Sequence, residues 1–250
     1  MLSILIPTLK KNQKYLDFCR ESLEENTLRD FEILIGENGE GTDYPQGQCQ
    51  AVNRIAKQAK GEWLLICNDD MYFPPAWDRN MKFVSDCMSL NCNFTWSPVE
   101  GLDYVDMPAG DEPETFDKGR VDNFIPPNYI ENGFTFPIII NHNLWNKIGG
   151  YDENYDPWGS NSDSDLEYKV ILSGVQPKIL RGVFVYHFGM KSGTFNDPQA
   201  QEYYQKNFTY FREKWGFDRV DTPRIQKADV IIDMDKLKYR PTFSIYKNGE

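Results

Sequence analysis

The feature that most constrains the fold is a short apolar run, residues 63–67, that leads directly into Asn68, Asp69 and Asp70. The run is too short and too uniformly apolar for an amphipathic helix, so it predicts an interior strand of an α/β sheet. Ligands of such sheets bind at the carboxyl ends of the strands. Carboxylates there offer hard oxygen ligands to Mg²⁺ or Mn²⁺, and the ion can bridge them to the phosphates of a nucleotide. The alternative is a polar turn before Pro74, and the triplet alone does not decide between the two.

Composition narrows the class of protein. A chain of 250 residues with 40% hydrophobic content can bury the core of one large α/β domain. Its net charge of -11, without a block rich in Lys or Arg, disfavours long nucleic acid as a partner. A small nucleotide remains compatible, because a bound divalent cation supplies positive charge locally. The five cysteines show no paired CxxC spacing, which is typical of reduced thiols in a cytosolic protein.

The order of the predicted elements in the first hundred residues is β-α-β-loop-α-β. Crossovers of this length imply parallel strands with helices on both faces of the sheet, a Rossmann-like arrangement. We expect strands at 2–6, 31–35 and 63–67, helices at 16–25 and 48–60, and a glycine-rich loop at 36–41.

In the second half of the chain, the predicted helices and strands alternate less regularly. Pro74 and Pro75 are expected to open a helix, and the polar, acidic segment 101–132 is expected to be a long loop over the site. Tyr204, Phe208, Phe211 and Trp215 recur at helical spacing, which indicates core packing or, as the alternative, contact with a membrane surface. The other expected elements are strands at 93–98, 134–141 and 183–186 and helices at 143–148, 165–173 and 199–215.

Several motifs occur in an order that resembles one known family. These are SILIPT at 3–8, EILIGENG at 32–39, NDD at 68–70, GGYDE at 149–153 followed by WG at 158–159, DSDL at 163–166 and VYHFG at 185–189. The chain resembles the family 2 glycosyltransferases, inverting enzymes of the GT-A fold that move a sugar from a nucleotide diphosphate to an acceptor. The resemblance implies a GT-A domain over 1–217, with a nucleotide-binding half at 1–100, an acceptor half at 101–217 and a C-terminal extension at 218–250.

The resemblance also implies a donor site. In the NDD motif, which is similar to the family's DxD, Asp70 takes the position of the metal ligand, and His187 lies where many members carry a further ligand for Mn²⁺ or Mg²⁺. A histidine at a strand end is otherwise a structural residue. For Asn53, a contact with the nucleotide and a place as an ordinary exposed polar residue of a helix are equally good interpretations. The residues expected to contact the nucleotide are Pro7, Thr8, Glu37 (where an Asp is usual), Asn38, Asn53, Asn68 and Asp69.

The acidic DSDL motif resembles the segment that supplies the family's catalytic base. This places Asp163 as the base, with Asp165 in reserve because Ser162 stands where a Glu is common. Both aspartates also suit the first turn of a helix, where the helix dipole favours negative charge. Tyr151, Trp158 and Gly159 are expected to contact the acceptor, together with the acidic segment 101–132, because aromatic faces suit sugar rings.

The implied activity is metal-dependent, inverting transfer from a nucleotide-diphosphate sugar, with UDP-sugars favoured, to a hydroxyl of a glycan or glycoconjugate. The alternatives are a non-catalytic carbohydrate- or nucleotide-binding module of the same fold and a sugar-nucleotide pyrophosphorylase. The latter needs a glycine-rich loop after the first strand, and Pro7-Thr8-Leu9-Lys10-Lys11 has no glycine. No apolar stretch approaches the roughly 18 to 20 residues of a membrane span. We therefore expect a soluble, cytoplasmic protein and leave peripheral membrane association open.

Overall fold

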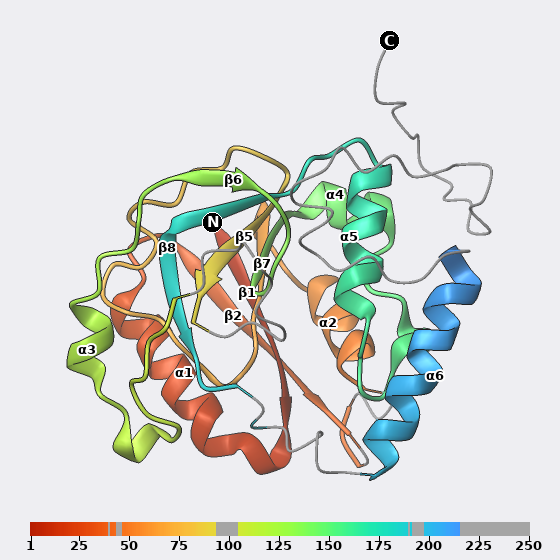
Figure 1. Ribbon diagram of the computed structural model, residues 1–250, viewed down its shortest axis with the longest axis horizontal. Helices are drawn as coiled ribbons and strands as arrows, with labels where there is room; N and C mark the ends of the chain where they lie inside the picture. The colour runs from red at the N-terminus through yellow and green to blue at the C-terminus, as the bar shows by residue number, and fades with distance from the viewer. Residues whose placement is uncertain (40, 44–46, 94–104, 190, 192–197, 216–250) are drawn as a thin grey trace.

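The structure is a mixed α/β domain built on an eight-stranded sheet with helices on both faces (Figure 1). The computed structural model describes residues 1–39, 41–43, 47–93, 105–189, 191 and 198–215. The predicted α/β class is confirmed. The predicted C-terminal extension, 218–250, lies outside the described residues.

The strands follow the order β2-β1-β3-β7-β5-β8-β4, and β6 pairs with β8 beside β4. The pairings make β1, β2, β3, β5 and β8 run in one direction and β4, β6 and β7 in the other. The mostly parallel sheet was expected, but these three antiparallel strands were not. Their bounds are β1 Leu2–Leu9, β2 Phe31–Asn38, β3 Trp63–Ile66, β4 Met71–Tyr72, β5 Cys87–Cys92, β6 Ile130–Asn132, β7 Ile138–Asn141 and β8 Lys178–His187.

The helices divide between the two faces of the sheet (Figure 1). One face carries α1 (Gln13–Asn26) and α3 (Lys118–Asp122), and the other carries the remaining four. Those four are α2 (Gln48–Ala56), α4 (His142–Ile148), α5 (Ser162–Leu172) and α6 (Pro198–Trp215), and short 3-10 helices cover Lys10–Asn12, Pro113–Thr115 and Glu153–Tyr155.

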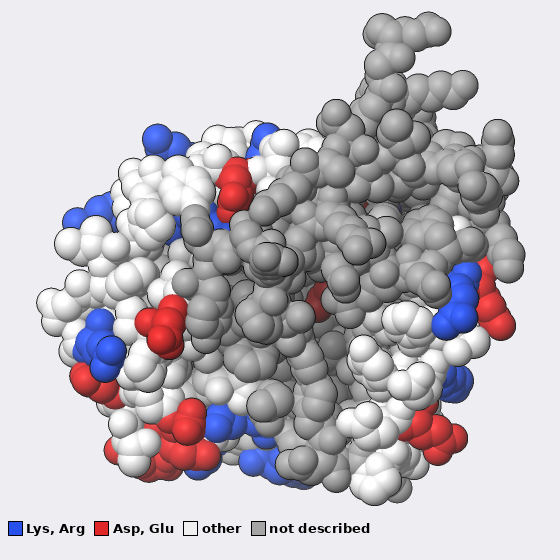
Figure 2. Space-filling model, in the orientation of Figure 1, with Lys and Arg blue, Asp and Glu red and all other residues white. Residues whose placement is uncertain are grey.

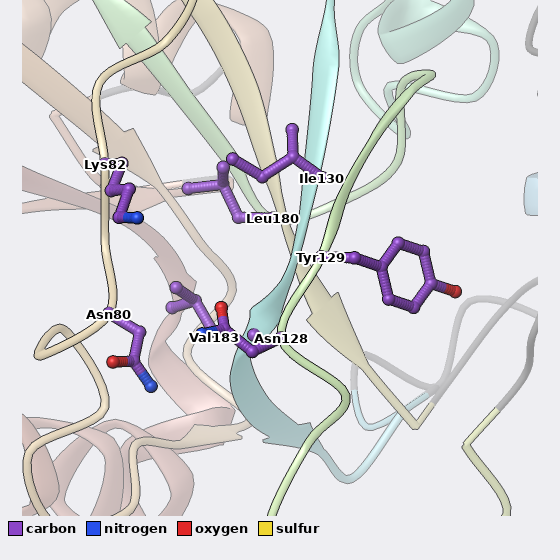
Figure 3. Close-up of a pocket in the computed structure, with 8 residues that line it drawn as sticks. Asn80, Lys82, Asn128, Tyr129, Ile130, Leu180 and Val183 are labelled. Atoms are coloured by element: carbon purple, nitrogen blue, oxygen red, sulfur yellow. The ribbon is translucent and has the colours of Figure 1, made fainter.

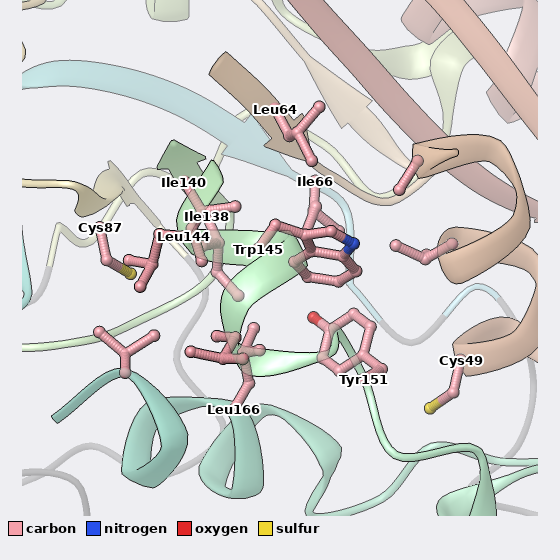
Figure 4. Packing of buried hydrophobic residues seen from close by; sticks show 14 of the residues in the cluster. Cys49, Leu64, Ile66, Cys87, Ile138, Ile140, Leu144, Trp145, Tyr151 and Leu166 are labelled. Atoms are coloured by element: carbon pink, nitrogen blue, oxygen red, sulfur yellow. The ribbon is translucent and has the colours of Figure 1, made fainter. Parts of the chain in front are cut away.

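The two faces are buried because the central strands are apolar on both sides. In β3, Leu64 and Ile66 point into the core beneath α2, α4 and α5, whereas Leu65 belongs to the core beneath α1. Successive side chains of a strand point to opposite faces, so a continuous apolar run is what a doubly covered strand requires. Figure 4 shows the first of these cores, where Trp145 and Leu166 meet the strand residues.

Three segments differ from the sequence-based expectation. No helix begins at Pro74: Ala76 has a φ of 55°, outside the helical region, and the chain continues in turns that bury Trp77. The strand expected at 93–98 lies earlier, as β5 (Cys87–Cys92), and 94–98 fall outside the described residues. The segment expected to be a long loop at 101–132 contains α3, β6 and a 3-10 helix in its described part, 105–132.

Helix α6 joins the domain through its last turns. Phe211 and Trp215 are fully buried, whereas Tyr204 is 39% exposed, so the C-terminal end of the predicted aromatic stripe packs in the core. Among the described residues, no helix combines the length and apolar content needed to cross a membrane.

A half-buried carboxylate fixes the same end of α6. Asp152 accepts hydrogen bonds from Lys214 Nζ at 2.7 Å and from Tyr210 Oη at 2.8 Å. Burial alone raises the pKa of Asp152, but the hydrogen bond from Lys214, the backbone N–H of Asn154 and the lysine charge outweigh it and bring the pKa to about 2.

We predict that Asp152→Asn lowers the free energy of unfolding by about 2 kcal/mol at neutral pH. A carboxyl whose pKa is depressed in the folded state stabilises the protein above its unfolded pKa of about 4. That stabilisation is lost as the pH falls through the folded pKa of about 2. Urea unfolding of the wild type and the variant at several pH values measures the difference. A difference that stays constant from pH 6 down to the acid transition would contradict the prediction.

Candidate functional site

The carboxyl ends of β1 and β8 lie at the lower edge of the sheet in Figure 1, and β3 runs parallel to β1. Polar residues at these ends or just beyond them lie in contact. Thr8 Oγ1 donates a hydrogen bond to Asp69 Oδ2 at 2.6 Å. Asn38 Nδ2, at the end of β2, donates to the Thr8 carbonyl at 3.0 Å. The edge predicted from the sequence to hold a nucleotide is therefore a connected polar network.

Asp69 is almost completely buried in this network. Burial raises its pKa to about 6, the neighbouring Asp70 charge adds to the rise, and the Thr8 hydrogen bond opposes it. Asn12 also contributes, with its Nδ2 3.4 Å from Asp69 Oδ1. Sequence reasoning missed Asn12. It stands just before α1, but its side chain makes no capping bond to that helix and reaches across to Asp69 instead.

Asp70 and His187 form the second half of the network. The Nε2 atom of His187 lies 3.0 Å from Asp70 Oδ1 and 3.2 Å from Asn68 Nδ2. Pairing of β4 with β8 places Met71 opposite His187, which is why two residues 117 positions apart meet. Asn93 also fixes the histidine, since its Oδ1 accepts from the His187 backbone N–H at 2.8 Å.

Asp70 keeps its charge despite burial. Burial alone raises its pKa, but the charge of His187 and the hydrogen bond between them outweigh this and lower the pKa below its usual value. A carboxylate oxygen beside an imidazole nitrogen fits Mn²⁺, and to a lesser degree Mg²⁺. In the described part of the chain, no group of three or more His, Cys, Asp or Glu side chains has the arrangement of a complete metal site. Asp70 and His187 are the two side chains here that could hold such an ion, and its other positions would be open to phosphate oxygens and water.

The neighbouring nucleotide candidates divide into two groups. Pro7 and Thr8 pair with Gly36 and Glu37 across β1 and β2, so the half-buried Glu37 lies at the same edge. Asn53 does not belong there: its Oδ1 accepts from the Tyr151 N–H at 3.0 Å and its Nδ2 donates to the Tyr151 carbonyl at 2.9 Å. Both ends of that amide are used to join α2 to the 149–153 segment, so the structure gives Asn53 a structural role in place of the expected nucleotide contact.

Asp163 lies at the same edge of the sheet. Helix α5 ends at Leu172, and a short connection leads into β8, which starts at the opposite edge, so the N-terminus of α5 faces the carboxyl ends of the strands (Figure 1). Asp163 is half-buried in the first turn of α5. Its Oδ1 accepts a hydrogen bond from Tyr151 Oη at 2.7 Å. Burial, followed by the Asp163 charge, raises the Tyr151 pKa, so the phenol stays protonated as a donor.

Asp165, two residues later, points into the core and is fully buried. Its Oδ1 accepts from Trp215 Nε1 at 2.9 Å and lies 2.6 Å from Lys214 Nζ. Its Oδ2 is 3.7 Å from Lys169 Nζ. Through its contacts with Trp215 and Lys214, Asp165 holds α5 against α6.

The residues expected to contact the acceptor differ in burial and surroundings. Tyr151 is 6% exposed and packs edge-on against Trp145 (Figure 4). Trp158 is half-buried, and its Nε1 is buried without a hydrogen-bond partner in the part of the chain that the structure describes. Gly159, with a φ of 65°, leaves room for Gln48, whose Nε2 would lie 2.2 Å from an added Cβ. The acidic segment packs on the other face: its Met107, Ala109 and Val121 share a core cluster with Tyr15 of α1.

A separate hollow of about 230 Å³ lies over the middle of β8. Leu180, Val183 and Ile130 form its apolar part, and Asn80, Lys82 and Asn128 stand around it (Figure 3). None of the site residues predicted individually lines it, although Asn128, Tyr129 and Ile130 belong to the segment 101–132 expected at the acceptor side. The candidate site is therefore the polar edge of the sheet.

Comparison with known sequences identifies a glycosyltransferase as a relative of this chain but matches it to no family model. A protein of Haemophilus influenzae described as an uncharacterized glycosyltransferase is 28% identical over 185 residues, which cover 62% of this chain and 60% of that protein. The chain thus has a glycosyltransferase as a relative, as its motifs indicated, and spans less than two thirds of that relative's length.

Solved structures support the fold. S. aureus TarS, residues 1–349, matches with a TM-score of 0.50 and 13% identity, covering 85% of this chain and 73% of that one. GalNAc-T7 with UDP, GalNAc and Mn²⁺ matches with a TM-score of 0.51 and 14% identity, covering 75% of this chain and 43% of that one. The fold is that of the GT-A glycosyltransferases, as expected.

We predict that Asp163 and Asp165 differ sharply in their contribution to stability. Asp165→Asn removes the charge that two buried lysines face and should lower the free energy of unfolding by about 3 kcal/mol. Asp163→Asn keeps an acceptor for Tyr151 and should cost less than about 1 kcal/mol. Chemical denaturation of the two variants under identical conditions measures both, and equal losses would show that the assignment of Asp165 is wrong.

Proposed function

We propose that this chain is a metal-dependent, inverting glycosyltransferase that moves a sugar from a nucleotide diphosphate to a hydroxyl of a glycan or glycoconjugate. One observation carries the proposal: the Asp70–His187 pair and the Asp163 carboxylate lie at the same edge of a GT-A sheet, at the carboxyl ends of its strands. Ligands of such sheets bind at that edge. The similarity to the Haemophilus influenzae glycosyltransferase also supports the proposal.

For the donor nucleotide, we propose the surface formed by the ends of β1 and β2. Pro7 and Thr8 offer backbone, and Glu37 offers a half-buried carboxylate that can accept bonds from a base or ribose. Asn38 donates a hydrogen bond to the Thr8 carbonyl, and Asp69 accepts one from the Thr8 hydroxyl. The two bonds fix the shape of this surface. UDP is the favoured nucleotide, and GalNAc-T7, whose structure contains UDP and Mn²⁺, shares the fold.

For the leaving group, we propose that Asp70 and His187 hold Mn²⁺ or Mg²⁺, with Asn68 orienting the imidazole. A bound ion of this kind neutralises charge that develops on the departing diphosphate. The NDD motif lacks one carboxylate relative to DxD, and the close approach of His187 to Asp70 supplies a nitrogen donor in its place.

For the transfer step, we propose that Asp163 takes the proton from the acceptor hydroxyl as it attacks the anomeric carbon. Tyr151 donates to Asp163 Oδ1 and so stabilises the ionised form that a base requires. Trp158, with its unpartnered indole N–H, is the aromatic group we propose for the acceptor side, beside Gly159. Tyr151 acts through Asp163 and is a positioning residue.

The first test is a thermal-shift screen of UDP, GDP, CDP and dTDP with Mn²⁺, Mg²⁺ or EDTA. A ligand that binds only the folded state raises its stability, by about 2.7 kcal/mol at a hundred times the dissociation constant. We expect a shift with one nucleotide that EDTA abolishes and that Asp70→Asn abolishes as well. A metal-independent shift would remove the metal from the proposal, and no shift with any nucleotide would favour a non-catalytic carbohydrate-binding module.

A second prediction concerns the base. Asp163→Asn should reduce kcat for transfer by about 10²- to 10⁴-fold, the usual contribution of a general base, and leave nucleotide affinity within twofold of the wild type. The measurement pairs steady-state transfer with calorimetric titration of the nucleotide diphosphate found in the screen. Turnover close to that of the wild type would assign the base to another residue.

A further inference from the structure

Glu112 connects the 105–124 segment to the edge of the candidate site. Its Oε2 accepts hydrogen bonds from Tyr15 Oη and Lys14 Nζ of α1, both at 2.5 Å, and its Oε1 lies 3.8 Å from Lys191 Nζ. Figure 2 shows groups of acidic and basic side chains side by side along the lower edge of the molecule, the region where α1 lies in Figure 1. Two lysines from distant parts of the sequence, Lys14 and Lys191, thus face the same carboxylate.

Of these lysines, Lys191 is the one next to the metal-ligand candidates. It follows His187 by four residues, and its backbone N–H lies near enough to the Asp70 carboxylate to help lower the pKa of that group. Its side chain is 18% exposed, whereas that of Lys14 is 49% exposed. The Lys191 ammonium also lies 6.0 Å from the centre of the Tyr15 ring, which gives it a partly apolar setting.

The site needs such a cation. Asp69, Asp70 and Glu37 all lie at this edge, in a chain whose net charge is -11, and a nucleotide diphosphate brings further negative charge. A lysine ammonium is a compact charge with three donors and binds phosphate well. An ion pair between partly exposed groups stabilises little, so the pair of Lys191 with Glu112 at 3.8 Å can be exchanged for a phosphate at small cost.

Glu112 is itself held in a packed segment. Two residues before it, the Gly110 carbonyl accepts from Tyr186 Oη of β8 at 2.7 Å, and four residues after it Phe116 packs against Tyr186 and Phe188. A charge on a fixed element positions its partner more accurately than one on a free loop. The segment therefore fixes the position of Glu112, the carboxylate that the Lys191 ammonium faces.

We propose that Lys191 binds the diphosphate of the donor and that Glu112 holds its ammonium in place beside Asp70 before the donor arrives. The inference rests on the proposed function, because it assigns the cation that the donor site uses besides the metal. It also gives the acidic 105–124 segment a role: it orients a residue of the donor site through Glu112, in place of the acceptor contact expected from the sequence.

The test is calorimetric titration of UDP, UMP and uridine in the presence of Mn²⁺, or of the nucleotide series that the screen identifies. Lys191→Ala should weaken UDP binding by about 10- to 100-fold, as the loss of charge-assisted hydrogen bonds predicts, and leave the weaker binding of uridine unchanged. Lys191→Arg should retain most of the UDP affinity, since it keeps the charge.

Lys14→Ala is the matched control, because it removes the other lysine of the same carboxylate without touching the site. It should leave UDP affinity within twofold of the wild type. Glu112→Gln should weaken UDP binding by about two- to fivefold, less than Lys191→Ala does, because the ammonium must then be ordered when the donor binds. Thermal unfolding of each variant confirms that it is folded.

The outcomes separate the two proposals. Equal UDP affinity of the wild type and Lys191→Ala, with binding still dependent on metal, overturns the role of Lys191 and leaves the proposed function intact. Equal losses in Lys191→Ala and Lys14→Ala also overturn it, because they indicate a general effect of the cluster. If the wild type binds none of UDP, GDP, CDP and dTDP, the proposed function fails and this inference fails with it.

Discussion

The candidate site depends on the alignment of the carboxyl ends of β1, β3 and β8 at one edge of the sheet. Pairing of β1 with β3 brings Thr8 to Asp69, and pairing of β4 with β8 brings His187 to Asp70. A shift of β8 by one residue would turn the histidine to the other face, because side chains alternate along a strand. The register that fills the two apolar cores therefore also fixes the distances within the site.

The parallel half of this arrangement could be predicted from the sequence. Short apolar runs that alternate with helical spacing over the first 67 residues imply β-α-β crossovers, and residues 68–70 then follow the carboxyl end of a buried strand. The directions of β4, β6 and β7 could not be predicted in this way, since a hydrophobic pattern shows which face is buried and not which way a strand runs. The turn at Ala76 was missed because its positive φ is unusual for a residue with a Cβ.

Side chains that act over long sequence distances were the hardest to place. Tyr151 was expected at an exposed lip, but its ring fills the core beside Trp145 and only its hydroxyl reaches Asp163. Asn12 and Glu112 contact residues 57 and 97 positions away, and nothing in the local sequence distinguishes either from an ordinary surface residue. Local patterns encode the elements, whereas these contacts arise only after the elements have packed.

The two aspartates of the DSDL motif show how one helical turn serves both folding and chemistry. Residues two apart on a helix point in different directions, so Asp165 faces α6 while Asp163 faces the edge of the sheet. The buried charge of Asp165 is neutralised by Lys214 and Lys169, which ties the start of α5 to the C-terminal helix. With α5 held in this way, the Tyr151 hydroxyl can orient the Asp163 carboxylate. A carboxylate on a helix fixed at its first turn loses little freedom when a substrate binds, which is what the base proposed for this position requires.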